Sequence, residues 1–260
     1  MFRSLAALAA SIVGIHAAYL GWVRPQAERS IEAAMEAGMA TPRNLWIVLK
    51  DYEQEICLVL MVWGLFLIFD KYRTILRQQY LFDTDLLEDT DVSGDPARAV
   101  RSFEELGRQR PDVWRTPLVQ TLAAGLRRFA VQRDVQNASE AIEAGVDALA
   151  AQQEAENSLI RYLIWAIPSI GFIGTVRGIG RALSQADQAL AGDIFAMTES
   201  LGLAFNSTLV ALLISIVLMF FLHQLQRLQD GLVIDTRRYC DEVLVGRISA
   251  LPAPDPDGTG

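Results

Sequence analysis

Two threonines in apolar surroundings are the residues of this sequence whose chemistry stands out. Thr175 lies in the stretch IPSIGFIGTVRGIGRAL (167–183), and Thr208 lies in the uncharged stretch LGLAFNSTLVALLISIVLMFFL (201–222). A hydroxyl group donates and accepts hydrogen bonds without carrying charge. Two such groups suit the lining of a narrow hydrated path, or a surface that receives the polar group of a partner. The alternative is plain hydrogen bonding between helices, worth about 0.6 kcal/mol on average in membranes.

Small residues accompany both threonines at helical spacing. They recur at i, i+3 and i+7 in each stretch: Gly171, Gly174 and Gly178 in the first, and Thr208, Ala211 and Ser215 in the second. Small residues let helix backbones approach closely, which favours association where lipid supplies no hydrophobic force. Pro168 frees a backbone carbonyl and can kink its helix. We therefore predict that these small residues pack helix against helix, and a packing face without a transport role is one interpretation of them.

Three further polar side chains interrupt the same apolar stretches. Arg177 and Arg181 are one turn apart and share a helix face. Because they lie toward the outer end of the helix, they can snorkel to the membrane interface. The other interpretation is a basic collar at an ion entrance, or a salt-bridge site for the outer segment of a partner. Asn206, in the second stretch, is a further candidate for a pore-mouth or partner contact.

Four apolar segments must position these residues. Residues 5–23 form 19 positions without formal charge, enough at 1.5 Å per residue to cross nearly all of a bilayer core of roughly 30 Å. Residues 56–69 span if their helix begins near Tyr52 and flanking basic residues snorkel. Residues 159–183 and 201–222 are the other two spans. A cleaved signal peptide is the alternative for the first segment, and a buried soluble helix is the alternative for the second.

The spans predict an all-α, polytopic membrane protein with long helical cytoplasmic extensions. We expect a two-span N-terminal region (1–70), a cytoplasmic helical segment (71–158), a second two-span region (159–223), a tail helix (224–250) and a disordered tail (251–260). Basic residues follow the second and fourth spans, which predicts a cytoplasmic C-terminus. The link 184–193 carries acids and no Lys or Arg, as expected outside. The link between the first two spans holds four basic residues and disagrees with this orientation.

The composition argues against several other classes. The net charge of −8 is unfavourable for nucleic-acid binding, which normally needs a basic face. Cys57 and Cys240 form no CxxC motif and only two histidines are present, so we expect no metal site and no cofactor. The glycine-rich stretch lacks the GK[ST] ending of a P-loop, and it follows a helix rather than a strand. We therefore expect no nucleotide site and no enzyme.

The two threonine-containing stretches carry a family resemblance. AIPSIGFIGTVRGIGRAL (166–183) resembles the proline-to-glycine signature of the MotA/TolQ/ExbB proton-channel family, and LGLAFNSTLVALLISI (201–216) resembles the helix that follows it. The similar region runs from about residue 161 to 232. It has the order Pro, Gly, Gly-Thr-Val-x-Gly, a short outer turn, and Ala-Phe-x-x-Thr. The first half of the chain is similar only in its layout of spans and a long cytoplasmic segment.

The resemblance implies an ion-driven stator subunit of the bacterial inner membrane. Family members form a ring, usually a pentamer, around a dimer of a smaller single-span partner of the ExbD/TolR/MotB kind. The partner's intramembrane aspartate carries the proton, and ion flow moves one ring against the other. By position, Pro168 corresponds to the family proline, and Thr175 and Thr208 correspond to its pore-facing threonines. These three residues would line the pore, with the threonines facing the partner's carboxylate.

Two features of the sequence bear on that expectation. Residues 159–183 and 201–222 contain no Asp or Glu, so a proton-carrying carboxylate has to come from a partner. Arg177 stands where the ExbB-like branch often has tryptophan, and Leu203 stands where that branch has an acid. These departures leave the transported cation, and conduction itself, open. A non-conducting scaffold and a polytopic signalling protein are the alternatives, and uptake, envelope maintenance, motility and defence are all compatible processes.

Overall fold

The structure is a computed structural model that describes residues 2–36, 44–87, 92, 94–192 and 194–249. These residues form helices and connecting turns, and none of them lies in a β-strand. Four helical stretches within them are long and apolar enough to cross a membrane. The predicted class, an all-α polytopic membrane protein, is therefore confirmed.

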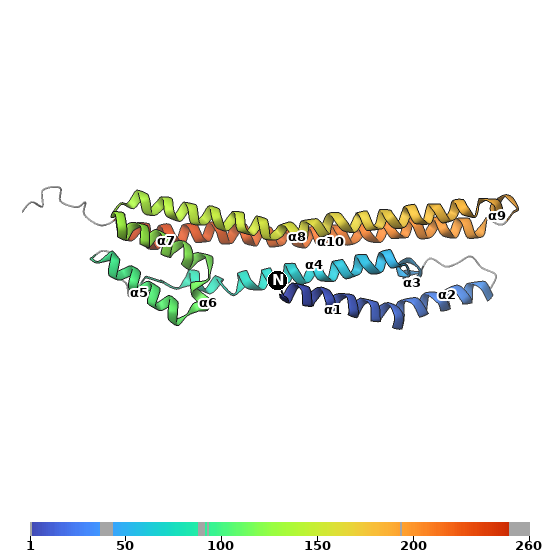
Figure 1. Cartoon of the computed structure of the whole chain (residues 1–260), viewed down its shortest axis with the longest axis horizontal. Coiled ribbons are helices and arrows are strands. Elements are labelled where there is room, and N and C mark those ends of the chain that lie inside the picture. The colour runs from blue at the N-terminus through green and yellow to red at the C-terminus, as the bar shows by residue number, and fades with distance from the viewer. Residues whose placement is uncertain (1, 37–43, 88–91, 93, 193, 250–260) are drawn as a thin grey trace, which may run out of the picture. The chain divides into compact units, whose positions relative to one another are not determined.

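The four long stretches contain the predicted spans (Figure 1). The first is α1 (Phe2–Ala18), which continues through a π-helical turn (Tyr19–Val23) into α2 (Arg24–Glu36). The second is α4 (Tyr52–Leu76), which begins at the predicted Tyr52 and is followed by a 3-10 turn (Gln79–Asp83). The third is α8 (Val135–Ser184). The fourth is α10 (Phe195–Cys240), with a π-helical turn (Asp241–Val245) and α11 (Gly246–Ser249) after it.

The shorter helices are α3 (Leu45–Leu49), α5 (Pro96–Gln109), α6 (Pro111–Trp114), α7 (Pro117–Gln132) and α9 (Ala186–Leu190). Three of them begin at a proline, whose fixed φ suits the first helical position and whose missing N–H is not needed there. Helix α7 ends at Arg133, whose φ of 52° is the left-handed conformation common just after a helix.

Two predicted boundaries differ in detail. The link at 184–193, which was predicted to lie outside, contains the short helix α9, because residues 184–191 hold no glycine or proline to prevent one. The tail helix predicted at 224–250 is not separate, since α10 runs unbroken from Phe195 to Cys240. Gly231 is the one helix-weakening residue between the apolar span and Cys240. The predicted disordered tail, 251–260, lies outside the described residues.

The chain divides into two compact units. The first comprises Met1–Lys71 and Ser158–Gln224, and the second comprises Tyr72–Asn157 and Leu225–Gly260. The second unit has its own apolar core, to which α7 contributes Leu122 and Leu126 and α8 contributes Ile142. Tyr239 ties the segment after α4 to this unit, because its hydroxyl donates to the carbonyl of Thr84 (2.6 Å) and accepts from the amide of Leu86 (2.9 Å).

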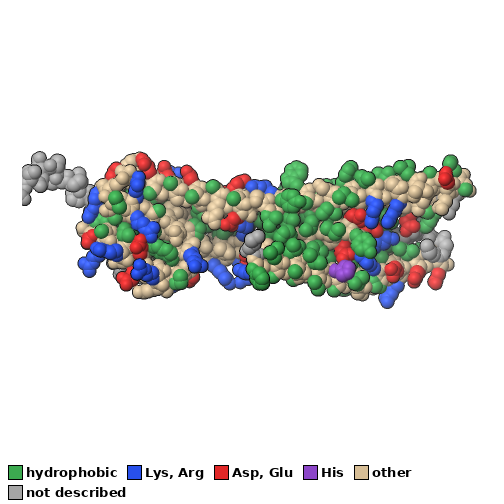
Figure 2. All heavy atoms as spheres, in the orientation of Figure 1, with side chains coloured by type: hydrophobic (Ala, Val, Ile, Leu, Met, Phe, Trp, Pro, Cys, Tyr) green, Lys and Arg blue, Asp and Glu red, His purple; other side chains and the backbone are tan. Residues whose placement is uncertain are grey.

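The first unit exposes many large apolar side chains. Phe172 and Val176 on α8, and Leu209 and Ile216 on α10, are each more than half exposed. Figure 2 shows hydrophobic side chains over much of the surface of this unit. A surface of this kind is stable in contact with lipid or with other apolar helices.

Candidate functional site

Helices α8 and α10 pack closely along the predicted small residues, and Figure 1 shows them running side by side. A Cβ added at Gly174 would lie 2.6 Å from Cβ of Ser207, and one at Gly178 would lie 2.5 Å from Cβ of Ala204. One at Gly171 would overlap Cβ of Ala211. Real Cβ atoms do not approach so closely, so any larger residue at these three positions would force the helices apart. We call this line of contact the α8–α10 seam.

The two threonines face each other across this seam. Their hydroxyl oxygens are hydrogen-bonded to each other. Each hydroxyl oxygen also lies 3.1 Å from a backbone carbonyl oxygen of the opposite helix, Thr175 from that of Ala204 and Thr208 from that of Gly171. Because each hydroxyl has a single proton to donate, two of these three hydrogen bonds can form at one time. Both side chains are half-buried. The arrangement is reciprocal, and each threonine is partly exposed at the surface of the helix pair.

Pro168 and Ser215 are linked through a backbone carbonyl of α8, and Pro168 lies about two turns before Thr175 on that helix. Proline has no N–H, so Pro168 leaves the carbonyl of Ile164 without its helical donor. The hydroxyl of Ser215 donates to that carbonyl at 2.9 Å, and Ser215 is buried. The group that the proline frees is thus satisfied by the neighbouring helix, as backbone groups at membrane depth require.

Arg177 lies on a different side of α8 from Thr175. Two residues advance a helix by about 200°, so the two side chains point in nearly opposite directions. The guanidinium Nη2 of Arg177 lies 2.7 Å from Oε2 of Glu53, in the first turn of α4, and 3.9 Å from Oδ1 of Asp51. The structure thus places Arg177 against α4, within its own subunit, and not on the edge of the seam that carries the threonines.

Glu53 is the first of three consecutive polar residues that connect α4 to other helices. Gln54 donates to the hydroxyl of Ser207 on α10 at 3.2 Å. Glu55 lies 2.6 Å from Nδ1 of His16 on α1 and accepts from Arg24 of α2 at 2.9 Å. All three α4 residues are buried, at 7%, 0% and 8% exposure. The start of α4 is therefore fastened to every other long helix of the first unit.

A small cavity of about 10 Å³ lies beside Arg177. Asp51, Arg181, Ser200 and Ser207 are among the residues that line it. Burial raises the pKa of Asp51, an effect that the nearby basic residues partly offset. Arg181 itself is exposed and forms no ion pair with the described residues. Asn206, the third candidate for a pore-mouth or partner contact, is half-buried on α10.

Two polar atoms beside this cluster have no hydrogen-bond partner among the described residues. They are Oε1 of Gln54 and Nε of Arg177, and both are buried. One is an acceptor and the other a donor, and such groups are costly to leave unpaired in a dry interior. The polar cluster at the start of α4 therefore has one acceptor and one donor that could bind a further polar group.

The contacts of α4 with the other helices were not predicted from the sequence. The pattern Asp51-Tyr52-Glu53-Gln54-Glu55 places several polar groups at the start of an apolar helix, where acids are expected for the helix dipole alone. Arginine in the apolar stretch of α8 called for a counter-charge. The acidic residues at the start of α4 and the arginine in α8 could have been paired on this ground, although 124 residues separate Glu53 from Arg177.

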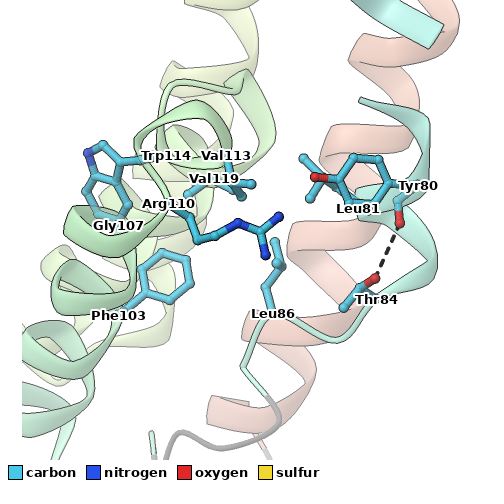
Figure 3. Close-up of a pocket in the computed structure, with 10 residues that line it drawn as sticks. All are labelled: Tyr80, Leu81, Thr84, Leu86, Phe103, Gly107, Arg110, Val113, Trp114 and Val119. Carbon is cyan, nitrogen blue, oxygen red and sulfur yellow. Dashed lines mark hydrogen bonds between the residues drawn. The ribbon is translucent and has the colours of Figure 1, made fainter. Parts of the chain in front are cut away.

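The second unit holds a larger cavity, of about 200 Å³, shown in Figure 3. Aromatic and aliphatic side chains line most of it, among them Tyr80, Phe103 and Trp114. The side chain of Arg110 extends into the space between the two walls. This cavity belongs to the second unit, and none of the predicted site residues lines it.

The fold and the seam define a polytopic membrane protein whose last two spans carry paired hydroxyl groups. Residues 113–237 match the family model of the MotA/TolQ/ExbB proton channel family. This range contains Pro168, the glycines, both threonines and Ser215. Through this region, which covers just under half of the chain, the protein is similar to the MotA/TolQ/ExbB family. No curated protein and no solved structure matches it.

Proposed function

We propose that this protein is the ring-forming subunit of an ion-gradient-driven channel, and that the ion is the proton. The observation that carries the proposal is the pair of hydroxyl groups, Thr175 and Thr208, held opposite each other in the family-matched helices. Hydroxyls of this kind can pass a hydrogen bond to a carboxylate or a water without a charge in the membrane. The role is transport rather than chemical catalysis, in keeping with the family.

The proton-carrying carboxylate is expected from a second protein. The last two spans, 159–183 and 201–222, contain no Asp or Glu. The acids at the start of α4 do not replace it, because Glu53 is paired with Arg177 and Glu55 with Arg24 and His16. We therefore propose a smaller, single-span partner with an intramembrane aspartate, enclosed by a homo-oligomer that is a pentamer.

The proposed setting is the bacterial inner membrane. Basic residues that follow the second and fourth spans support a cytoplasmic location for the second unit and the C-terminus. Ion flow past the threonines would then move the partner relative to the ring, and the second unit would be the part available to cytoplasmic contacts.

A second candidate, a non-conducting scaffold of the same fold, is favoured by one observation. The threonine hydroxyls already bond to each other and to carbonyls of the opposite helix. Bonds of this kind can hold two helices together with no ion passing. A conducting role requires that one of these bonds be exchanged for a bond to the partner's carboxylate or to water.

Reconstitution into liposomes tests the two candidates. The full chain would be purified with the single-span protein that co-purifies with it, and its subunit number would be determined by native mass spectrometry. A pH-sensitive dye inside the vesicles would report proton flux under an imposed gradient. We expect a 5:2 assembly with flux above that of protein-free vesicles. Flux at the protein-free level, from an intact assembly, would support the scaffold.

A further inference from the structure

The first turn of α4 touches the α8–α10 seam on the edge opposite the threonines. Viewed down the axis of α8, Gly174 points about 60° away from Arg177, in the direction of the centre of the seam. A Cβ added at Gly174 would lie 3.2 Å from Cγ of Glu53 and 2.7 Å from Oγ of Ser207. Three helices therefore meet at this glycine, one turn or less from Thr175.

Side chains from α4 fix both partners of the seam at this level. Glu53 holds α8 through Arg177, and Gln54 holds α10 through Ser207. Ser207 and Thr208 are adjacent in sequence, and Arg177 is two residues from Thr175. A rotation of either helix that moved a threonine out of the pair would thus also break a bond to α4.

The ion pair is the stronger of these two bonds. Its carboxylate is 7% exposed, and a hydrogen bond between charged groups is roughly twice as strong as a neutral one. The side chain of Arg177 is 36% exposed, so it is the removal of Arg177 that would leave an uncompensated buried charge, on Glu53. Arg177 has no other ion pair as short, since its distance to Asp51 is 3.9 Å.

We propose that Glu53 and Arg177 are positioning residues for the threonine pair. Glu53 holds Arg177, Arg177 fixes the rotation of α8, and Thr175 is thereby held opposite Thr208. In this account Arg177 is not a contact for the ion or for the partner. The inference deepens the proposed function, since the threonines are the groups that the pair positions, but the placement itself does not depend on conduction.

Disulfide trapping measures the placement directly. Cysteines replace the two threonines of the full chain in the double variant Thr175→Cys/Thr208→Cys. Their sulfur atoms should come within bonding reach, because the native hydroxyl oxygens are within hydrogen-bond distance. The rate of intrachain disulfide formation would be measured in membranes by mass spectrometry after oxidation. The single variants Thr175→Cys and Thr208→Cys control for the native Cys57 and Cys240, both of which are buried.

The trapping rate would be compared in four backgrounds. In Glu53→Gln and in Arg177→Gln we expect trapping to slow by about tenfold or more, because each removes the ion pair that holds α8 to α4, and Arg177→Gln also leaves the buried carboxylate of Glu53 unpaired. The reversed pair Glu53→Arg/Arg177→Glu should return the rate to within about threefold of the parent. Glu55→Gln is the matched control. It neutralises an equally buried carboxylate on the same helix, but one that faces α1 and α2, so the trapping rate should not change.

Two results would overturn the positioning role: equal trapping rates in all backgrounds, or slow trapping in the reversed pair when that protein inserts normally. If Glu53→Gln does not accumulate, the contrast between Arg177→Gln and Arg177→Lys decides the matter: lysine keeps the charge and should trap at nearly the parental rate, whereas glutamine should trap slowly, and equal rates in the two would overturn the role. Proton flux of the same backgrounds, with threonines intact, separates this inference from the channel proposal. Trapping that follows the ion pair while even the parent shows no flux would leave the positioning role standing and the channel proposal refuted.

Discussion

The hydroxyl of Ser215 donates a hydrogen bond of 2.9 Å to the carbonyl of Ile164, the carbonyl that Pro168 leaves without its helical donor. The proline of α8 is therefore matched by a serine of α10, 47 positions later in the sequence. A break in the backbone ladder of one span is repaired by the side chain of the next. This link joins the two residues that the sequence analysis had assigned to separate roles.

Ser215→Ala should lower the stability of the full chain by about 1–3 kcal/mol, because it leaves the Ile164 carbonyl buried and unpaired. Pro168→Ala restores an N–H at position 168 for that carbonyl. In the Pro168→Ala background, Ser215→Ala should therefore cost much less than in the parent. Thermal unfolding of the four proteins in detergent gives the coupling. An equal cost of Ser215→Ala in both backgrounds would refute the link.

Alanine substitutions at glycines inside and outside the α8–α10 seam should affect stability differently. Gly174→Ala places a methyl group 2.6 Å from Cβ of Ser207 and should destabilise the protein by about 1–3 kcal/mol. Gly180, six residues later on α8, has open space where its Cβ would be. Gly180→Ala should be neutral or stabilising by up to about 1 kcal/mol, because alanine is the better helix former. Unfolding midpoints that did not separate the two variants would contradict close packing at Gly174.

The carboxyl group of Asp51 should make the stability of the folded protein depend on pH. Burial raises the pKa of its carboxyl group, so the folded protein holds this proton more tightly than the unfolded chain does. The contribution of Asp51 to stability is therefore present below its ordinary pKa and is lost as the pH rises through the raised, folded-state pKa. Asp51→Asn has no such proton to lose. Its unfolding midpoint should fall less than that of the parent between acidic and neutral pH, and parallel curves would contradict the assignment.

Asp51→Asn should also be milder than Glu53→Gln at neutral pH. The carboxylate of Asp51 is 3.9 Å from Arg177, whereas that of Glu53 is 2.7 Å away. Because charging Asp51 is unfavourable in the fold, its neutral replacement removes a cost along with a weak attraction. The same unfolding experiment compares the two variants, and a larger loss in Asp51→Asn would reverse the assignment of Arg177 to Glu53.

Hydropathy and spacing predicted much of this architecture. An uncharged run such as 201–222 has few alternatives to a membrane-spanning helix, because lipid requires backbone groups to be satisfied within the segment. The three glycines at i, i+3 and i+7 predicted a close helix contact, and the geometry of α8 and α10 has one there. Both the hydrophobic length of a span and the spacing of its glycines can be read from one short stretch of sequence, so both features could be predicted without knowing the rest of the fold.

The contacts of α4 depend on how separate helices pack together, and no single stretch of sequence predicts that. Nothing local to Glu53 indicates that it faces α8 while Glu55, two residues later, faces α1 and α2. That choice depends on how four helices pack, which a single stretch does not encode. Likewise, the small residues beside Thr175 and Thr208 indicated a shared face, but their reciprocal bonds to the carbonyls of Ala204 and Gly171 depend on the relative height of two helices.

Proton flux through threonine variants tests the central claim most directly. The full chain and its single-span partner would be reconstituted in liposomes as the parent, as Thr175→Val/Thr208→Val, and as Thr175→Ser/Thr208→Ser. Valine keeps the shape of threonine but removes the hydroxyl, whereas serine keeps the hydroxyl. The account predicts flux in the parent and the serine protein, and flux at the protein-free level in the valine protein. Equal flux in the valine protein and the parent would contradict it.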